Sequence, residues 1–416
     1  MQHYLKDIER AVIVGAGPGG AALATLLGRA GIRIAMLHEP KRPELIVGES
    51  LVPATIPVLR ALGVEREVAE FSTYKPGATF FVRPEEPLKI VFCPRGSTYA
   101  YNVPRAQFDD TVLGAAVRTR GVSLMQESGK LTYRASTDTF SLEEEQLARV
   151  RDILGGEPQL FVDASGRARE FAKTSELRSV RGKRNDCVIF AHHDRCELEN
   201  EGHIHINRLS RGWSWRIPLP DRASIGVVTP AAEWRAFGDT PEERYDEYLR
   251  TEPILAAATR TSQRISSVAV YTNYQLIGER FSGTNWVLVG DAAGFVDPIF
   301  SSGLDLTLNG AMRCAKAVLR GGPRAFDEYE REQRRNILAW QLLAESFYDG
   351  RLFGLIRASS LWRNTPPWNH VIPHAERHLV RAIAGMLPFD SLRFRVASSV
   401  LRSGFGQRYG HRFAVQ

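Results

Sequence analysis

Short apolar runs punctuated by glycine organise the N-terminal part of the chain. The run at 11–14 (AVIV) has no polar alternation, which is typical of a strand buried on both faces. The glycine-rich segment 15–20 follows, then a stretch of small residues, and then a second apolar run at 32–37 (IRIAML). A strand, a helix and a strand within about 30 residues form the smallest dinucleotide-binding unit, so we expect a Rossmann-like start.

The rest of the chain alternates between strand-like and helix-like patterns. Strands are expected at 79–83, 88–93, 159–163, 203–207, 213–217, 224–228 and 285–290, and helices at 54–62, 105–119, 241–250, 303–320 and 324–349. The charge-rich segment 142–152 fits either a helix or a solvated connection. Strand-rich segments inserted among helical ones indicate an α/β fold with α+β insertions.

This pattern predicts two parts. Residues 1–345 form a core that is interleaved with a second sheet, mainly in the regions 70–100 and 180–280, and residues 346–416 form a helical, basic C-terminal region. The 416 residues are 44% hydrophobic and 24% charged, which excludes a disordered, collagen-like or coiled-coil chain. The net charge is +7, and residues 351–416 hold ten arginines against two acids. Such a tail predicts either an acidic partner or surface, or a solvated basic face.

The cysteine pattern and the hydropathy of the chain indicate the cellular compartment in which the protein is expected. The four cysteines are far apart and form no C-x-x-C pair, which fits a reducing cytoplasm and gives no metal-binding pattern. The N-terminus (MQHYLKDIER) has no apolar signal core, and no apolar run reaches the roughly 18 residues of a spanning helix. We therefore expect a cytoplasmic protein with no transmembrane segment, no metal and no nucleic-acid partner.

The glycine segment has the spacing of a dinucleotide-binding turn. Gly15 permits the tight turn, Gly17 lets the backbone approach a pyrophosphate, and Gly20 lets the helix pack closely on the strand. The helix N-terminus then stabilises phosphate charge. Glu39 ends the second strand, where a carboxylate can accept hydrogen bonds from ribose hydroxyls.

Three further segments favour flavin over nicotinamide. Segment 286–294 (WVLVGDAAG) resembles the second flavin motif of the aromatic-hydroxylase superfamily of FAD proteins, in which the aspartate, here Asp291, binds the ribityl chain. Segment 103–109 resembles that superfamily's helix start, whose arginine, here Arg105, contacts the cofactor, and 161–167 resembles its D-A-x-G segment. The resemblance implies FAD and a Rossmann-like fold of the aromatic-hydroxylase type, with a substrate-covering sheet.

Two further signatures narrow the chemistry. Segment 213–218 reads W-x-W-x-I-P, and its two tryptophans, Trp213 and Trp215, lie on one face of a strand. This hexapeptide resembles the signature of flavin-dependent halogenases, which implies that the two tryptophans separate the flavin from the organic substrate. A second signature of the same family is also matched. Segment 295–303 reads F-x-x-P-x-x-S-x-G and opens a helix, whose amides and dipole can hold an anion.

The second signature implies the halide site. Its Pro298 and Ser301 match the family pattern, and the amides of Ser302 and Gly303 would bind chloride or bromide. Halogenases of free tryptophan have a glutamate immediately before the matched serine, whereas this chain has Phe300. The departure resembles the phenol and pyrrole branch, whose members often act on acyl groups tethered to an acidic carrier protein.

The third element is Lys75, in the segment 75–78 (KPGA). It precedes an apolar strand, so its stem is expected to be buried, and a desolvated lysine becomes a usable nucleophile or hydrogen-bond donor. Phenol and pyrrole halogenases carry their essential lysine in such a segment. Segment 48–53 also resembles their G-E-S-x-V-P sequence beside the flavin. The implied cofactor-binding residues are Gly15, Gly17, Gly20, Glu39, Gly48, Glu49, Ser50, Arg105, Asp291 and Gly294.

The resemblance implies a two-component halogenase of natural-product biosynthesis. A partner flavin reductase supplies reduced FAD (FADH2), O2 adds to give a flavin hydroperoxide, and halide converts it to hypohalous acid. The acid passes Trp213 and Trp215 to Lys75, which delivers the halogen to an electron-rich aromatic substrate. Two alternatives stay open: a flavin-dependent aromatic monooxygenase or reductase/saturase, and a non-catalytic flavin-fold scaffold in a biosynthetic complex.

Overall fold

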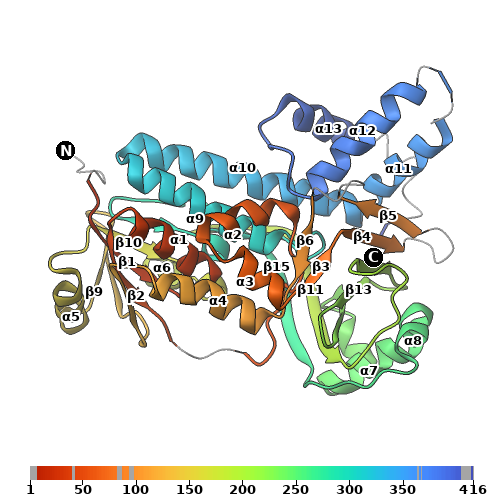
Figure 1. The fold of residues 1–416 in the computed structure, drawn as a ribbon, viewed down its shortest axis with the longest axis horizontal. Coiled ribbons are helices and arrows are strands. Elements are labelled where there is room, and N and C mark those ends of the chain that lie inside the picture. Colours follow the sequence, from red (N-terminus) through yellow and green to blue (C-terminus); the bar gives the residue numbers. More distant parts are fainter. Residues whose placement is uncertain are drawn as a thin grey trace.

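The computed structural model describes residues 7–39, 43–81, 87–92, 98–362, 365–366, 368–403 and 414–415. The body at the left of Figure 1 holds a sheet covered by helices. A second sheet lies at the lower right with two short helices beneath it, and the C-terminal helices sit above.

The first sheet has five parallel strands. Their order is β16 (Trp286–Leu288), β10 (Leu160–Asp163), β1 (Arg10–Val14), β2 (Arg33–Leu37) and β7 (Val122–Met125). The central strands are buried apolar runs, because helices cover the sheet. The helices that contact its strands are α1 (Pro18–Arg29), α4 (Arg105–Val117) and α5 (Glu144–Leu154), and α9 (Ser302–Arg320) packs against α1.

The second sheet has eight strands and is mostly antiparallel. Its order is β17 (Gly294–Phe295), β15 (Ala269–Gly278), β11 (Ser179–His193), β14 (Ala223–Pro230), β13 (Trp213–Pro218), β12 (Ile204–Arg208), β4 (Gly77–Phe81) and β5 (Pro87–Val91). Trp213, Trp215 and Phe80 point from one face into the main core. The other face carries a second core under α7 (Pro241–Thr251) and α8 (Pro253–Thr259).

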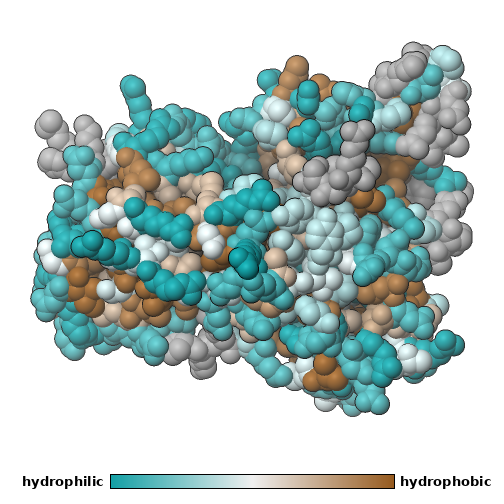
Figure 2. Space-filling model, viewed as in Figure 1, coloured by the Kyte–Doolittle hydropathy of each residue, from teal (hydrophilic) through white to brown (hydrophobic). Residues whose placement is uncertain are grey.

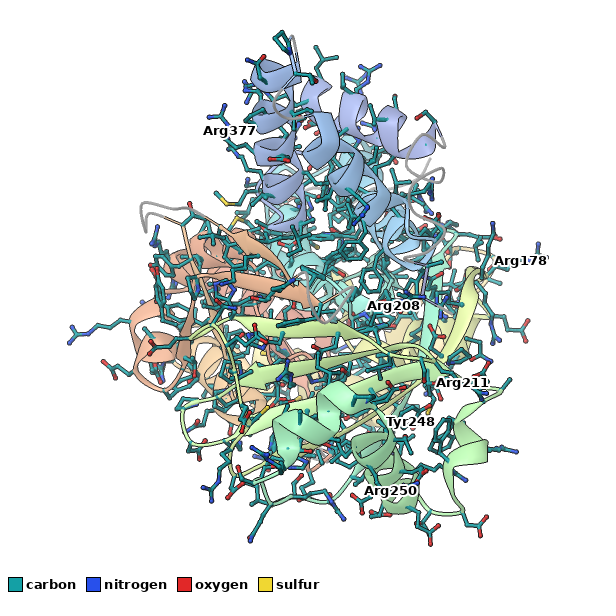
Figure 3. All side chains as sticks on the ribbon, turned by 90° about the vertical axis from the view of Figure 1, so that its right-hand side faces the viewer. Arg178, Arg208, Arg211, Tyr248, Arg250 and Arg377 are labelled. Carbon is teal, nitrogen blue, oxygen red and sulfur yellow. The ribbon has the colours of Figure 1, made fainter. Side chains whose placement is uncertain are left out.

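Figure 3 shows this second face from the side. Tyr248 of α7 lies under the strands, whereas Arg250, two residues later, points away from the protein. Buried tyrosines alternate with charged residues because α7 is amphipathic. Its N-terminus is fixed by a capping box between Thr240 and Glu243.

Helices make up the C-terminal part. The long α10 (Pro323–Tyr348) packs beside α9, and α11 (Arg351–Trp362), α12 (Trp368–Ile383) and α13 (Leu392–Arg402) follow. In Figure 2 teal hydrophilic residues interrupt the brown hydrophobic patches across the visible face. Within the described residues, no helix combines the length and the hydropathy that a membrane crossing requires.

The α/β fold with α+β insertions is confirmed, and most expected elements are present within a few residues of their expected ends. Most of segment 142–152 is helical, as α5, which begins at Glu144, whereas Leu142 ends the strand β9 (Thr139–Leu142). The strands expected at 79–83 and 88–93 are β4 and β5, although residues 82–83 and 93 lie outside the described residues. The division near residue 345 stays a prediction, and it falls inside α10.

Two long strands were not predicted. β11 and β15 pair along most of their length, with a register shift between Arg181 and Asn185. The first half of β11 is polar and half exposed, so it lacks the alternation that identifies a strand in sequence. Pairing with its neighbours, rather than its own composition, holds it in the sheet.

Candidate active site

A cavity of about 690 Å³ lies between the two sheets. One wall comes from the carboxyl ends of β1, β10 and β16, and the opposite wall from β12 and β13. Its volume and mixed lining are typical of a cofactor or substrate site. Thirteen of the seventeen expected site residues line it: Gly15, Gly17, Glu39, Gly48, Glu49, Ser50, Arg105, Trp213, Trp215, Asp291, Pro298, Ser301 and Gly303.

The glycine turn at the cavity has the geometry its spacing predicts. Gly15 has φ +103°, and a Cβ there would lie 2.4 Å from the Ala164 carbonyl oxygen. A Cβ on Gly20 would lie 2.0 Å from the Gly15 carbonyl oxygen, so Gly20 serves the packing of α1 and does not line the cavity. Gly17 faces open space. It is also the N-cap of α1 and makes no side-chain cap bond, which leaves the first helical amides for an anion.

Two charged residues shape the rim of the cavity. Glu39 lies just beyond β2, and its carboxylate accepts a hydrogen bond of 3.0 Å from the Ser128 hydroxyl. Arg105 forms a two-pronged ion pair with Asp109, at 3.0 and 3.1 Å, and donates to the Val47 carbonyl. The Val47 contact ties the first turn of α4 to the 48–50 segment, so Arg105 both lines the cavity and fixes its wall.

Asp291 and Gly294 follow β16 and take different positions. Asp291 lies in the turn Gly290–Ala292 and lines the cavity, and burial raises the pKa of its carboxyl to about 6. Gly294 faces away from the cavity. A Cβ there would lie 3.0 Å from the Leu276 carbonyl oxygen, so Gly294 allows β17 to pack against β15.

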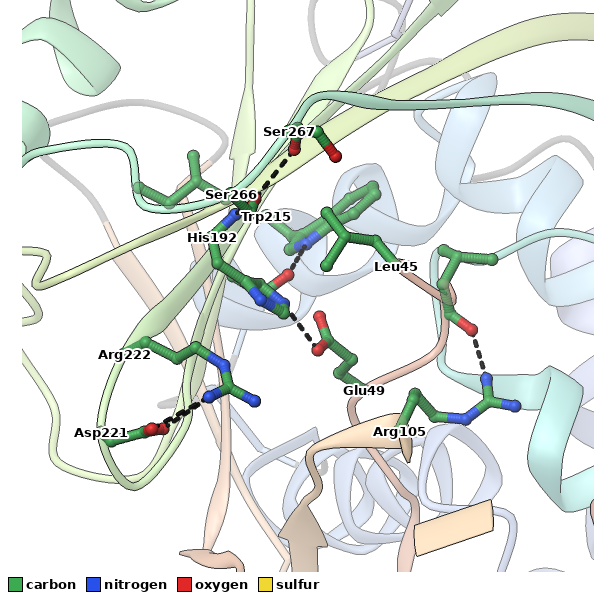
Figure 4. Close-up of polar contacts among 12 residues, drawn as sticks. Leu45, Glu49, Arg105, His192, Trp215, Asp221, Arg222, Ser266 and Ser267 are labelled. Carbon is green, nitrogen blue, oxygen red and sulfur yellow. Dashed lines mark hydrogen bonds and ion pairs between the residues drawn. The ribbon is translucent and has the colours of Figure 1, made fainter. Parts of the chain in front are cut away.

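Glu49 has a partner that sequence reasoning did not assign. Its buried carboxylate lies 2.8 Å from Nε2 of His192, a residue of β11 that is 143 positions away. Figure 4 shows this contact beside the Trp215 ring, and the backbone amide of His192 bonds to the Ser266 hydroxyl. The pair joins the 48–50 segment to the second sheet.

The two tryptophans form one wall, as expected from their spacing. Trp213 and Trp215 are both buried, and their ring centroids lie 5.8 Å apart. The indole N–H of Trp215 donates to the Ser224 hydroxyl (3.2 Å), and that of Trp213 donates to the Tyr348 hydroxyl (2.9 Å). Both indole donors are therefore satisfied away from the cavity, which leaves an apolar wall.

The start of α9 supplies another part of the cavity lining. Pro298, Ser301 and Gly303 line it, and Ser301 is held in a left-handed conformation with φ +56°. A non-glycine residue in this region is uncommon and marks a backbone that its surroundings hold in place. Gly303 faces open space. The Ser302 side chain points the other way and donates to the Asp297 carbonyl (3.2 Å).

Lys75 is buried, as its position before an apolar strand predicts, but it does not line the cavity. Its Nζ donates to the Ser50 hydroxyl and the Leu51 carbonyl, each at 2.7 Å, and lies 5.4 Å from the centroid of the Phe92 ring. Burial lowers the pKa of Lys75 to about 7. Ser50, which does line the cavity, separates the amine from it.

These residues fit a flavin dinucleotide. An uncapped helix N-terminus, a glycine with no Cβ to obstruct a ligand, a carboxylate at the end of β2 and an arginine at the rim are the donors and acceptors that such a cofactor requires. Within the residues that the structure describes, no group of three or more His, Cys, Asp or Glu side chains could hold a metal ion.

Comparison with known proteins agrees with this geometry. Residues 9–152 match the model of an FAD-binding domain family, and residues 92–365 match that of the tryptophan halogenase family. The chain belongs to the tryptophan halogenase family. It is accordingly an FAD-dependent halogenase, an oxidoreductase, and the resemblance noted in the sequence motifs is confirmed.

Relatives differ in the substrate that their names state. A tryptophan 2-halogenase of Chondromyces crocatus is 26% identical over 83% of this chain and 69% of its own length. A chlorinase of 1H-pyrrole-2-carbonyl-[peptidyl-carrier protein] from Pseudomonas fluorescens is 27% identical, over 81% of this chain and 83% of its own.

Solved structures share the fold. The myxobacterial chondrochloren halogenase CndH is 26% identical and superposes with a TM-score of 0.70, over 98% of this chain and 95% of its own. The brominase Bmp2 gives a TM-score of 0.78 at 20% identity, over 96% and 98%. At that identity the likeness shows the fold alone.

Proposed function

We propose that this protein chlorinates or brominates an electron-rich aromatic substrate of the phenol or pyrrole type, and that Lys75 delivers the halogen. The observation that carries the proposal is the position of that amine. It is fully buried one side chain behind a flavin-type cavity, with a pKa near neutrality. A surface lysine would be protonated at neutral pH and would have no access to an oxidant made inside the protein.

The start of α9 supports a halide site. Its first amides have no acceptor within the helix, and the left-handed Ser301 turns the backbone so that Gly303 faces the cavity. Amides at a helix N-terminus favour an anion. We assign the Ser302 and Gly303 amides to chloride or bromide, with Pro298 and Ser301 shaping the turn.

Reduced FAD, when bound and reoxidised by O2, supplies the two-electron oxidation that converts halide to hypohalous acid. Trp213 and Trp215 close the cavity on the side of β13. They thereby separate the organic substrate from the flavin, where the oxidant forms. The acid then passes Ser50, whose hydroxyl accepts from Lys75 and donates to Asn102 at 2.9 Å. The neutral amine of Lys75 attacks the halogen of the acid, so that an N–halogen bond forms as the O–halogen bond breaks and water leaves. The haloamine then transfers its halogen to the aromatic ring, and the proton lost from the ring returns to the amine nitrogen.

Phe300 supports a phenol or pyrrole substrate. Its ring lies among aromatic side chains, 6.2 Å from Phe80 and 6.4 Å from Trp340. An aromatic residue here offers no carboxylate for a free amino acid, and the match to the named pyrrole chlorinase covers most of both chains. We propose that the substrate is carried as an acyl group on an acidic carrier protein.

Two partners follow from this proposal. A separate flavin reductase supplies reduced FAD. The carrier meets the basic C-terminal region, where Arg393, Arg395 and Arg402 are exposed on α13. Arg377 of α12 also points outward in Figure 3. Arg408 and Arg412, which belong to the same basic tail in the sequence, lie outside the described residues.

The test is reconstitution with a flavin reductase, FAD, O2, bromide or chloride, and phenol or pyrrole-2-carbonyl substrates, free and as carrier thioesters. Mass spectrometry should show halogenated product with the isotope pattern of the added halide. A hydroxylated or reduced product without halogenation would instead support the monooxygenase or reductase alternative. Bound FAD without any turnover would support the non-catalytic scaffold.

A further inference from the structure

Tyr348, the last residue of α10, joins two parts of the site through one hydroxyl. The indole N–H of Trp213 lies 2.9 Å from this oxygen, and the Asp297 carboxylate oxygens lie 3.1 and 3.3 Å from it. An indole N–H only donates, so the Tyr348 oxygen accepts from Trp213 and its own proton points to Asp297. Burial raises the pKa of Tyr348 well above its usual value, so the hydroxyl keeps this proton.

Asp297 in turn shapes the backbone that opens α9. One carboxylate oxygen accepts from the Ile299 amide at 3.0 Å, and the Asp297 carbonyl accepts from the Ser302 hydroxyl at 3.2 Å. These bonds span the turn that places Ser301 in its left-handed conformation. A shift of the Asp297 carboxylate therefore changes the direction of the amides assigned to halide.

The ring of Tyr348 is fixed from the second sheet. The guanidinium of Arg184 stacks 3.6 Å from the ring centroid, and Arg184 itself pairs with Asp186 at 2.7 and 2.8 Å. Both residues lie on β11, whereas Tyr348 lies on α10. The position of the Tyr348 hydroxyl is thus fixed by contacts from both a helix and a strand, and the ring cannot turn freely.

We infer that Tyr348 is a positioning residue. It holds the tryptophan wall (Trp213 and Trp215) and the halide loop (residues 297–303) at a fixed distance from each other. It is absent from the cavity lining, so it acts through Trp213 and Asp297 and touches neither cofactor nor halide. The inference rests on the proposed function for what the loop and the wall do. Loss of the hydroxyl would leave a buried indole donor without its acceptor and a buried carboxylate without one of its donors.

The first test is Tyr348→Phe, with Tyr329→Phe as the matched control. Tyr329 lies on the same helix, is also buried, and donates its hydroxyl proton to the Leu288 carbonyl at 2.6 Å. Hydrogen exchange of the full chain, with and without FAD, should quicken at least fivefold in the peptide 296–304 of the Tyr348 variant only. Equal exchange in both variants, or no change in that peptide, would overturn the inference.

The second test is the halide dependence of the reaction. Tyr348→Phe should raise the KM for bromide at least fivefold while kcat changes less than twofold, and Tyr329→Phe should change neither. If Tyr348→Phe folds poorly, Asp297→Asn keeps the side-chain shape and should give the same local change. The wild type could fail to halogenate any substrate while exchange still quickens only in peptide 296–304 of the Tyr348 variant. That result contradicts the proposed function but supports the positioning role of Tyr348. A halogenating Tyr348→Phe with wild-type halide KM contradicts the coupling.

Discussion

Replacing Lys75 by methionine changes the pH dependence of stability in a way that the structure predicts in sign and size. Methionine matches the length of the stem and cannot ionise. In the folded protein burial lowers the pKa of Lys75 to about 7, whereas in the unfolded chain the group returns to its ordinary 10.5. The difference corresponds to about 5 kcal/mol of penalty for carrying the charge inside the protein.

The sign follows from proton binding. Between pH 7 and 10.5 the unfolded chain binds the proton and the folded protein does not, so the stability of the wild type rises with pH across this window. The slope approaches 1.4 kcal/mol per pH unit, roughly, for one fully depressed group. Lys75→Met lacks this contribution. Relative to the variant, the wild type should therefore gain about 3 kcal/mol between pH 7.5 and 9.5.

Urea unfolding of both proteins at several pH values, followed by tryptophan fluorescence, measures this difference. The halogenation rate of the wild type should rise over the same range with an apparent pKa near 7, because the amine reacts in its neutral form. Parallel stability curves would show that Lys75 is not desolvated. A rate that falls as pH rises through 7 would show that the ammonium, acting as a hydrogen-bond donor, is the working form.

Three glycines give contrasting expectations. Gly15→Ala places a Cβ 2.4 Å from a backbone carbonyl at φ +103°, so it should destabilise the protein and release FAD on gel filtration. Gly303→Ala meets open space, so its thermal stability should stay near that of the wild type while the KM for halide rises; an unchanged KM would remove Gly303 from the halide site. Gly226→Ala puts a Cβ 2.2 Å from the Trp215 ring, which should cost about 1–3 kcal/mol in urea unfolding and raise the fraction of oxidant lost to solvent.

Features governed by local sterics could be predicted from the sequence. The positive φ of Gly15, the open space at Gly17 and the close packing at Gly20 depend on a turn and a helix start within six residues. The two tryptophans share a face because side chains alternate along a strand. The burial of Lys75 followed from the apolar strand after it. In each case the information lies in neighbouring positions.

Features that depend on distant segments could not be predicted. His192 lies 143 residues from Glu49, and Tyr348 looks in sequence like the end of an amphipathic helix. Motif membership also did not tell which side chains face the cavity. Gly294 and Ser302 belong to the expected segments, but Gly294 packs against β15 and the Ser302 hydroxyl bonds to the Asp297 carbonyl. In such turns some residues face the cavity while their neighbours pack against the rest of the protein.

The central claim is that an oxidant made in the flavin cavity reaches the substrate through Lys75. The most direct test is the fate of that oxidant in Lys75→Met, with reduced FAD, O2, bromide, a phenolic or pyrrole substrate and monochlorodimedone as a scavenger in solution. The variant should keep consuming reduced FAD with bromide, yet the bromine should appear on the scavenger and none on the substrate. Brominated substrate formed at the wild-type rate despite the scavenger would contradict the claim.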